Sequence, residues 1–175
     1  DGKSMCIPMA LAGTFQAVNA VTAAVMAHAS GLPLHDSLWA LPYVTGAEGR
    51  MQLVSGHPAG ARVVVDYAHT PDALESALKA LRPETRGRLA VVFGAGGDRD
   101  AGKRPMMGST AHRHADLVYV TDDNPRSEDA AAIRTAIIEN CPNAIEIPDR
   151  GEAIASAMRD LNADDVLLIA GKGHE

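Results

Sequence analysis

Residues 62–81, RVVVDYAHTPDALESALKAL, decide the fold of this chain. The β-branched run 62–66 is typical of a short buried strand. Thr70 is a good helix N-cap, and Pro71 suits the first position of a helix. The apolar residues that follow recur at helical spacing, at Leu74, Ala77, Leu78 and Leu81. The stretch therefore predicts a buried strand, a polar loop and a helix with one apolar face.

The same alternation continues downstream. Further strands are predicted at 89–93, 117–121, 145–147 and 166–170, and further helices at 105–114, 129–140 and 152–161. Five strands that alternate with four helices are typical of an α/β fold with a doubly wound, mostly parallel sheet. Met106 and Met107, on the second of these helices, are interpreted as core residues.

The region before residue 62 is organised differently. Residues 15–30 are predicted to form a helix, which Gly31 and Pro33 end. Its apolar residues recur at helical spacing, at Val18, Val21, Val25, Met26 and Ala29. Residues 35–41 could form a second short helix, on which Trp39 is interpreted as a core residue. Residues 42–61 contain six Gly or Pro residues, which makes them the best candidate for a domain boundary.

Four of the predicted strands run directly into polar loops, at 66–72, 94–100, 122–126 and 171–175. In doubly wound sheets, ligands bind outside the carboxyl ends of the strands. We therefore expect the four loops to open on one edge and to form a binding site. The strand at 145–147 is followed by residues 148–151, which are interpreted as a plain turn.

The loop after residue 93 imitates a dinucleotide-binding fingerprint. Gly94 and Gly96 have the required spacing, but the sixth position, where Gly or Ala is needed for close helix–strand packing, is Arg99. We therefore interpret the loop as a glycine-rich ligand loop of another kind.

The same loop almost spells a P-loop at residues 97–103. The next residue is Arg104, where Ser or Thr would have to hold magnesium, and Asp98 and Asp100 would repel phosphate. A phosphate cradle is therefore not expected here, and Lys103 with Arg104 is interpreted as a solvated turn.

Composition bounds the class of protein. The 175 residues are 46% hydrophobic and 22% charged, which suits a globular domain, and the net charge of -6 argues against a general nucleic-acid or membrane binder. No apolar run reaches the roughly 20 residues of a membrane span.

Cys6 and Cys141 match no disulfide or metal pattern, and His112 and His114 lack partners at metal spacing. We therefore expect free thiols, no metal site and a cytoplasmic location. The start at Asp1 and the end at Glu175 suggest a fragment.

Three motifs carry a resemblance to a known family. Asp66-Tyr-Ala-His-Thr-Pro-Asp72, Asp122-Asp-Asn-Pro-Arg126 and Gly171-Lys-Gly-His-Glu175 each follow a predicted strand. In this order they resemble the Mur ligases, and among them the diaminopimelate-adding MurE type. The resemblance covers nearly the whole chain. It implies that residues 1–47 are the helical end of a central ATP-binding domain, and that residues 48–175 are a Rossmann-like carboxyl-terminal domain truncated at its end.

The resemblance also implies a site for the incoming amino acid, meso-diaminopimelate. The family residues for this substrate map onto Arg99, Asp123, Asn124, Pro125, Arg126, Gly171 and Glu175. The chemistry suits the substrate, because forked guanidinium groups of Arg99 and Arg126 can bind two carboxylates and Glu175 can bind an ammonium. Pro125 is expected to fix the loop.

For ATP, the family residues map onto Asn19, Arg50 and Asp66, while Gln16 stands where the first Asn of the family's motif is usual. Asp66 suits a ribose hydroxyl, although a turn aspartate is an equally good reading of the residue itself. His69 is expected to order its loop. The P-loop, the magnesium ligands and any catalytic residue are expected upstream of Asp1.

The implied activity is an ATP-dependent ligase that joins meso-diaminopimelate to UDP-N-acetylmuramoyl-L-alanyl-D-glutamate through an acyl phosphate, with Mg²⁺. The chain alone is expected to be inactive, and its partners would be these small molecules, with no nucleic acid or membrane. Two alternatives stay open. One is a related amide ligase, either a lysine-adding Mur ligase or a cyanophycin synthetase-like enzyme. The other is a non-catalytic amino-acid-binding module.

Overall fold

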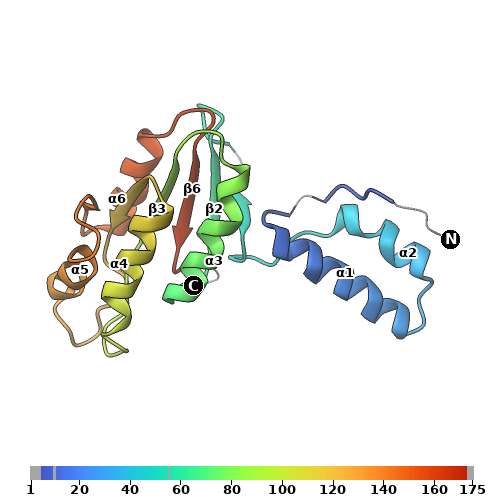
Figure 1. Ribbon diagram of the computed structural model, residues 1–175, viewed down its shortest axis with the longest axis horizontal. Helices are drawn as coiled ribbons and strands as arrows, with labels where there is room; N and C mark the ends of the chain where they lie inside the picture. Colours follow the sequence, from blue (N-terminus) through green and yellow to red (C-terminus); the bar gives the residue numbers. More distant parts are fainter. Residues whose placement is uncertain (1–4, 10, 55, 173–175) are drawn as a thin grey trace.

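The computed structural model describes residues 5–9, 11–54 and 56–172 (Figure 1). Within these residues, six strands form one sheet in the order β1-β2-β6-β3-β4-β5. The strands are β1 (Gln52–Val54), β2 (Arg62–Asp66), β3 (Leu89–Phe93), β4 (Leu117–Val120), β5 (Ile145–Glu146) and β6 (Val166–Ala170). Only β1 pairs antiparallel, with β2, and the other pairs are parallel. The predicted α/β class and mostly parallel sheet are confirmed.

Helices cover both faces of the sheet. They are α3 (Pro71–Leu81), α4 (Lys103–His114), α5 (Ala130–Ile138) and α6 (Arg150–Arg159), with a 3-10 turn η2 (Arg82–Glu84) after α3. Helices α3 and α4 lie in front of the strands in Figure 1. The core on the face of α3, α4 and α5 includes Val64, Val91 and Leu168, whereas the core of the opposite face, under α6, includes Ala90 and Leu167. Alternate residues of the buried strands thus serve opposite layers, as a doubly wound sheet requires.

Helix α3 shows how the sequence sets these elements. The Thr70 hydroxyl accepts a hydrogen bond from the Ala73 backbone N–H at 3.3 Å, and Pro71 occupies the first turn. Leu74, Leu78 and Leu81 are fully buried. Burying a leucine side chain stabilises a fold by roughly 1.5–3 kcal/mol, so these three residues hold α3 on the sheet. The strand, cap and apolar face predicted from residues 62–81 are confirmed.

The structure adds one strand and corrects two predictions about the core. Strand β1, which was not predicted, lies inside the range 42–61, and all three of its residues are exposed. Trp39 and Met106 are each 56% exposed and do not belong to the core. Met107 is buried as predicted, whereas Met106, about 100° away around the helix axis, points out of the core.

The amino-terminal segment extends to one side of the sheet (Figure 1). It contains α1 (Thr14–Ala29), α2 (Leu34–Trp39) and the 3-10 turn η1 (Leu41–Tyr43). Its small core is formed by Ala20, Ala24 and Leu41. The larger apolar residues that predicted α1 are exposed, among them Val18 and Met26. Helix α1 therefore turns its small residues inward and its large ones outward.

The two cysteines are free thiols, as predicted. Cys141 is buried, and burial raises the pKa of its thiol, whereas Cys6 is exposed. Among the described residues, no helix combines the length and the apolar character needed to cross a membrane.

Candidate functional site

The polar loops open on one edge of the sheet. Strand register places Asp66 beside Ala170, and Phe93 beside Val120, so four strands reach the same edge together. The backbone N–H of Gly171 donates to the Asp66 carbonyl at 3.0 Å, and that of Thr121 donates to the Phe93 carbonyl at 3.0 Å. The prediction that the loops after these strands share one edge is confirmed.

One pocket at this edge has a volume of about 420 Å³ and contains both predicted recognition arginines, so we call it the arginine pocket. It is lined by Tyr67, His69, Gly94, Ala95, Gly96, Arg99, Asp100, Lys103, Arg104, Met107, Asp123, Asn124, Arg126 and Gly171. Five of the seven residues predicted to bind the amino acid are among them. Pro125 does not line the pocket, and Glu175 lies outside the described residues.

Glycines bring the two main loops of the arginine pocket into contact. A Cβ atom on Gly94 would overlap the carbonyl oxygen of Thr121, and one on Gly97 would overlap that of Pro125. The Gly97 N–H instead donates to the Asn124 carbonyl at 2.8 Å. Gly94 of the dinucleotide-like pattern and Gly97 of the P-loop-like run therefore allow the two loops to pack backbone against backbone.

Two residues of these loops adopt a left-handed backbone conformation, Asp98 with φ 53° and Arg126 with φ 50°. For a residue with a Cβ atom this costs on the order of 1–2 kcal/mol. Hydrogen bonds between the loops offset the strain. Ser127 Oγ donates to Asp98 Oδ1 at 2.6 Å, and Arg126 Nη1 donates to the Gly97 carbonyl at 2.6 Å.

Arg104 corrects the prediction of a solvated turn. It is only 6% exposed, and both terminal nitrogens of its guanidinium donate to Glu128. The distances are 2.8 Å from Nη1 to Oε2 and 2.7 Å from Nη2 to Oε1. These hydrogen bonds raise the pKa of Arg104 and lower the pKa of Glu128. The prediction failed because an arginine next to a lysine in a glycine-containing loop looks like solvent-exposed charge until its partner, 24 residues away, is known.

Arg150 corrects the interpretation of residues 148–151 as a plain turn. Its Nη2 donates to the Ala170 carbonyl at 2.7 Å, immediately before Gly171 of the arginine pocket. Among the residues that the structure describes, its buried Nε and Nη1 have no hydrogen-bond partner, and burial lowers the pKa of this arginine. The turn does begin a helix, because Asp149 accepts from the Glu152 N–H at 2.7 Å, but it also places a cation under the end of β6.

Acidic residues after β4 are held by cations of other elements. Arg134 of α5 is 8% exposed and donates both to Asp122 and, at 2.7 Å, to Glu146 of β5. Asp123 lies 3.6 Å from Lys172 Nζ. The loop that carries the predicted recognition motif is therefore fixed at its start by Arg134.

A second pocket, of about 400 Å³, contains all three residues predicted to bind ATP, and we call it the Asp66 pocket. It is lined by Phe15, Gln16, Asn19, Ala47, Arg50, Met51, Asp66, Ala73, Ser76 and Ala77. Asp66 serves as a turn aspartate, since its two oxygens accept from the N–H groups of Met51 and Ala68, each at 2.8 Å. A carboxylate offers about four acceptor positions, so the same group can also accept from a ligand hydroxyl.

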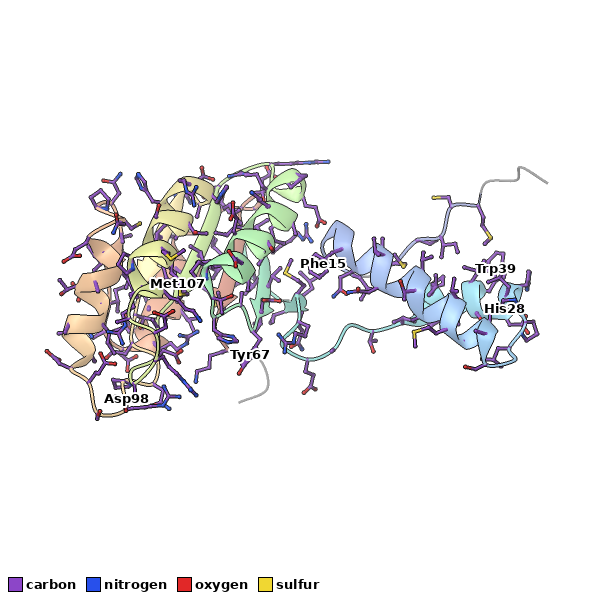
Figure 2. All side chains as sticks on the ribbon, turned by 60° about the horizontal axis from the view of Figure 1, so that its bottom comes forward. Phe15, His28, Trp39, Tyr67, Asp98 and Met107 are labelled. Atoms are coloured by element: carbon purple, nitrogen blue, oxygen red, sulfur yellow. The ribbon has the colours of Figure 1, made fainter. Side chains whose placement is uncertain are left out.

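The loop after β2 separates the two pockets. Tyr67 and His69 line the arginine pocket, and their rings meet edge to face at 4.7 Å. The Arg50 guanidinium, from the Asp66 pocket, stacks 4.7 Å above the Tyr67 ring. Figure 2 shows Tyr67 between Phe15 of the Asp66 pocket and Asp98 of the loops around the arginine pocket. A ligand in one pocket would thus lie next to a ligand in the other.

Among the described residues, no three His, Cys, Asp or Glu side chains gather in a way that could hold a metal ion. The edge offers three arginines, a lysine, acidic groups and an amide in the arginine pocket, and an arginine, a carboxylate and two amides in the Asp66 pocket. A doubly wound sheet with adjacent polar pockets of this kind defines an α/β domain whose pockets suit two small, charged ligands side by side.

The chain belongs to the Mur ligases, because the family model described as "Mur ligase, glutamate ligase domain" matches residues 49–173. It is 55% identical over its full length to the UDP-N-acetylmuramoyl-L-alanyl-D-glutamate–2,6-diaminopimelate ligase of Chelativorans sp. (strain BNC1), and 53% identical to the ligase of that name from Caulobacter vibrioides. The chain spans 36% of the length of each of these curated relatives.

Solved structures agree with this family. A diaminopimelate ligase of the same name is 40% identical, with a TM-score of 0.75, over 98% of this chain and 36% of that one. The UDP-N-acetylmuramate-alanine ligase of Thermotoga maritima shares the fold with a TM-score of 0.72 at 21% identity, over 97% of this chain and 37% of that one.

Proposed function

We propose that this chain is part of an ATP-dependent cytoplasmic ligase that adds meso-2,6-diaminopimelate to UDP-N-acetylmuramoyl-L-alanyl-D-glutamate during peptidoglycan precursor synthesis. The observation that carries the proposal is a pair of adjacent pockets. One brings together Arg99, Asp123, Asn124 and Arg126, and the lining of the other suits a nucleotide. Relatives that are more than 50% identical and bear this activity in their names support it. In this proposal residues 1–47 belong to the ATP-binding domain and residues 48–175 to the carboxyl-terminal domain.

The arginine pocket suits a diamino dicarboxylic acid. Guanidinium groups bind carboxylates through two parallel hydrogen bonds, so Arg99 and Arg126 would each take one carboxylate. Asn124 lines the pocket, and its side-chain amide can both donate and accept. Glu175 would bind an ammonium, and Gly171 gives the backbone its turn, with φ 83°.

The Asp66 pocket suits one side of ATP. Arg50 would bind phosphate, Asp66 would accept from a ribose hydroxyl, and the amides of Asn19 and Gln16 would contact the nucleotide. Gln16 Oε1 already accepts from Asn19 Nδ2 at 3.2 Å, so the longer side chain keeps its amide next to that of Asn19. The P-loop and the magnesium ligands would come from the rest of the longer protein.

The proposed reaction has two steps. The terminal phosphoryl group of ATP passes to the D-glutamate carboxylate, which gives an acyl phosphate and ADP. The amine of diaminopimelate then attacks the acyl carbon, and the tetrahedral intermediate releases phosphate as the amide forms. The contribution of this chain is to hold the amine next to the acyl phosphate, since positioning can supply on the order of 7–11 kcal/mol at best.

The test is an assay of the full-length protein with ATP, Mg²⁺ and the UDP-linked dipeptide, and with either meso-diaminopimelate or L-lysine. We expect ligation of diaminopimelate, favoured over lysine by about 10⁴-fold in kcat/KM, because lysine would leave one guanidinium without a partner. Preference for lysine would reassign the substrate, and absence of any ATP-dependent ligation would contradict the proposal. The 175-residue chain alone should not hydrolyse ATP.

A further inference from the structure

Glu128 holds both arginine-bearing loops of the arginine pocket at once. Its Oε1 accepts from the Asp98 N–H at 2.6 Å and from Arg104 Nη2 at 2.7 Å, and its Oε2 accepts from Arg104 Nη1 at 2.8 Å. Asp98 directly precedes Arg99, and Glu128 comes two residues after Arg126. One carboxylate therefore fixes the residue before Arg99 relative to the segment that follows Arg126.

We infer that Glu128, locked by Arg104, is a positioning residue that sets the separation of the Arg99 and Arg126 guanidinium groups, and through it the affinity and selectivity for a dicarboxylic amino acid. This inference rests on the proposed function. Glu128 is not among the residues that line the arginine pocket, and Arg104, which does line it, has both Nη atoms engaged by Glu128. Their effect would pass through the backbone of the two loops.

A purely local role for Glu128 is already filled by other groups. Helix α5 begins at Ala130, and its cap is Asp129, whose Oδ1 accepts from the Ala131 N–H at 3.0 Å. The loop before α4 closes without it too, because the Gly102 N–H donates to Asp100 Oδ1 at 3.0 Å. What Glu128 adds is a carboxylate that binds the Asp98 N–H, 30 residues away, and the buried Arg104 at the same time, beside the hydrogen bonds that already join the two loops.

The chemistry of the pair suits a rigid spacer. The Arg104 side chain is 7% exposed and meets both oxygens of one carboxylate, so neither group can rotate without breaking two hydrogen bonds. Asp98 on one loop and Arg126 on the other are both held in left-handed backbone conformations. If the carboxylate were lost, these residues could relax toward ordinary backbone angles, and both guanidinium groups would move.

The experiment uses the full-length enzyme with Glu128→Gln, which keeps the size of the side chain but removes the charge and one acceptor. We expect the KM for meso-diaminopimelate to rise by about tenfold or more, since small displacements of binding groups have large effects. The KM for ATP should stay within about twofold, and kcat at saturating diaminopimelate should change little. Arg104→Lys, which keeps the charge but loses the fork, should show the same split with a smaller rise.

The matched control is Glu152→Gln, which removes the charge from an exposed ion pair with Arg159 on α6, at 2.7 Å. Arg104→Gln combined with Glu128→Gln should cost about as much as either change alone, because the two residues act as a unit. If Glu128→Gln lowers the yield of folded enzyme, the inference is tested with Glu128→Asp and Arg104→Lys. The measurement is the same: the rise in the KM for diaminopimelate compared with the rise in the KM for ATP.

Three outcomes would overturn the inference while the wild type still ligates diaminopimelate. One is kinetics like those of the control. Another is an equal rise in the KM for diaminopimelate and in the KM for ATP. The third is a fall in melting temperature with unchanged KM values, which would make the pair a stabilising contact only. Failure of the wild-type reaction would instead contradict the proposed function, so the two ideas are tested separately.

Discussion

The two pockets lie side by side but are built in different ways. Both main walls of the arginine pocket are loops of one sheet, joined by direct hydrogen bonds such as those from Gly97 to Asn124 and from Ser127 to Asp98. The Asp66 pocket has one wall on α1 and the other on β2 and α3. The arginine pocket is therefore formed by folding of the sheet, whereas the Asp66 pocket also requires that α1 and the sheet keep their relative position.

This difference suits the proposed chemistry. A pocket that must distinguish similar amino acids benefits from a rigid frame, because selectivity depends on groups that cannot adjust. A pocket shared by two segments can open and close, which is a common way to admit and release a nucleotide. Substitutions at one pocket should then leave the other largely unchanged.

The largest effect is expected from Gly97→Ala, which tests the rigid frame. The new methyl group would overlap the Pro125 carbonyl oxygen, so the two loops must separate. We expect kcat/KM for diaminopimelate to fall on the order of 10³-fold, about 4 kcal/mol, with the KM for ATP within a factor of a few. Gly46→Ala is the control, because its nearest neighbour is the end of the Leu11 side chain at 3.4 Å. Equal, small effects of both would show that the loop contact is not tight.

Arg126→Ala tests the ligand side of the same pocket. Loss of a guanidinium that pairs with a carboxylate should cost roughly 2–5 kcal/mol in kcat/KM for diaminopimelate if the pair becomes buried on binding. Lysine, which lacks the second carboxylate, should be affected much less, so selectivity should collapse. Steady-state kinetics with both amino acids measures this. An equal loss for both would mean that Arg126 binds the carboxylate they share, and the choice between them would move to Arg99.

Asp165→Asn should weaken the sheet and change neither pocket. Burial alone would raise the pKa of Asp165, but hydrogen bonds from Arg88 and from the backbone N–H of Asn162 outweigh it and lower that pKa to about 2. With an unfolded value of 3.8, the carboxylate stabilises the fold by about 2 kcal/mol above pH 4, and this is lost as the pH falls toward 2. Urea unfolding at pH 7 and pH 3 measures it, with the exposed neighbour Asp164→Asn as control. An equal loss of stability at both pH values would contradict the charge argument.

The smallest effect is expected from Asp66→Ala at the Asp66 pocket. Loss of one hydrogen bond to a sugar hydroxyl should cost roughly 0.5–1.5 kcal/mol, which is a rise in the KM for ATP of about two- to twelvefold. Because Asp66 also binds the Met51 and Ala68 N–H groups, the melting temperature should fall slightly too. Asp72→Ala, at the exposed start of α3, is the control. A rise in the KM for diaminopimelate instead of ATP would place the nucleotide elsewhere.

The sequence predicted those parts of the fold that follow from local patterns. The continuous apolar runs of β3 and β6, and the cap of α3, could be located to the residue. Strand β1 could not, because its three residues are all exposed and too few to show alternation. The position of β6 in the middle of the sheet depends on pairing between distant segments, which periodicity does not describe.

The candidate site was predictable for a different reason. Motifs at strand ends placed Arg99, Asn124 and Arg126 at one edge before their distances were known, because parallel strands end together. The residues that hold them there were missed. Arg104 is buried and Arg150 is half-buried, and the role of each depends on a partner far along the chain. In a single sequence, where those partners are unknown, both look like ordinary loop charges.

The order of the strands has a consequence for synthesis. Strands β2 and β3 do not pair with each other, and both pair with β6, which is the last of the six strands to be made. While residues 166–170 are still inside the ribosome, the emerged chain holds two separate sheet fragments whose inner edges are bare. Such edges are open to pairing with other chains. This sheet is therefore most exposed to misassembly just before β6 emerges, when binding by a chaperone would protect it most.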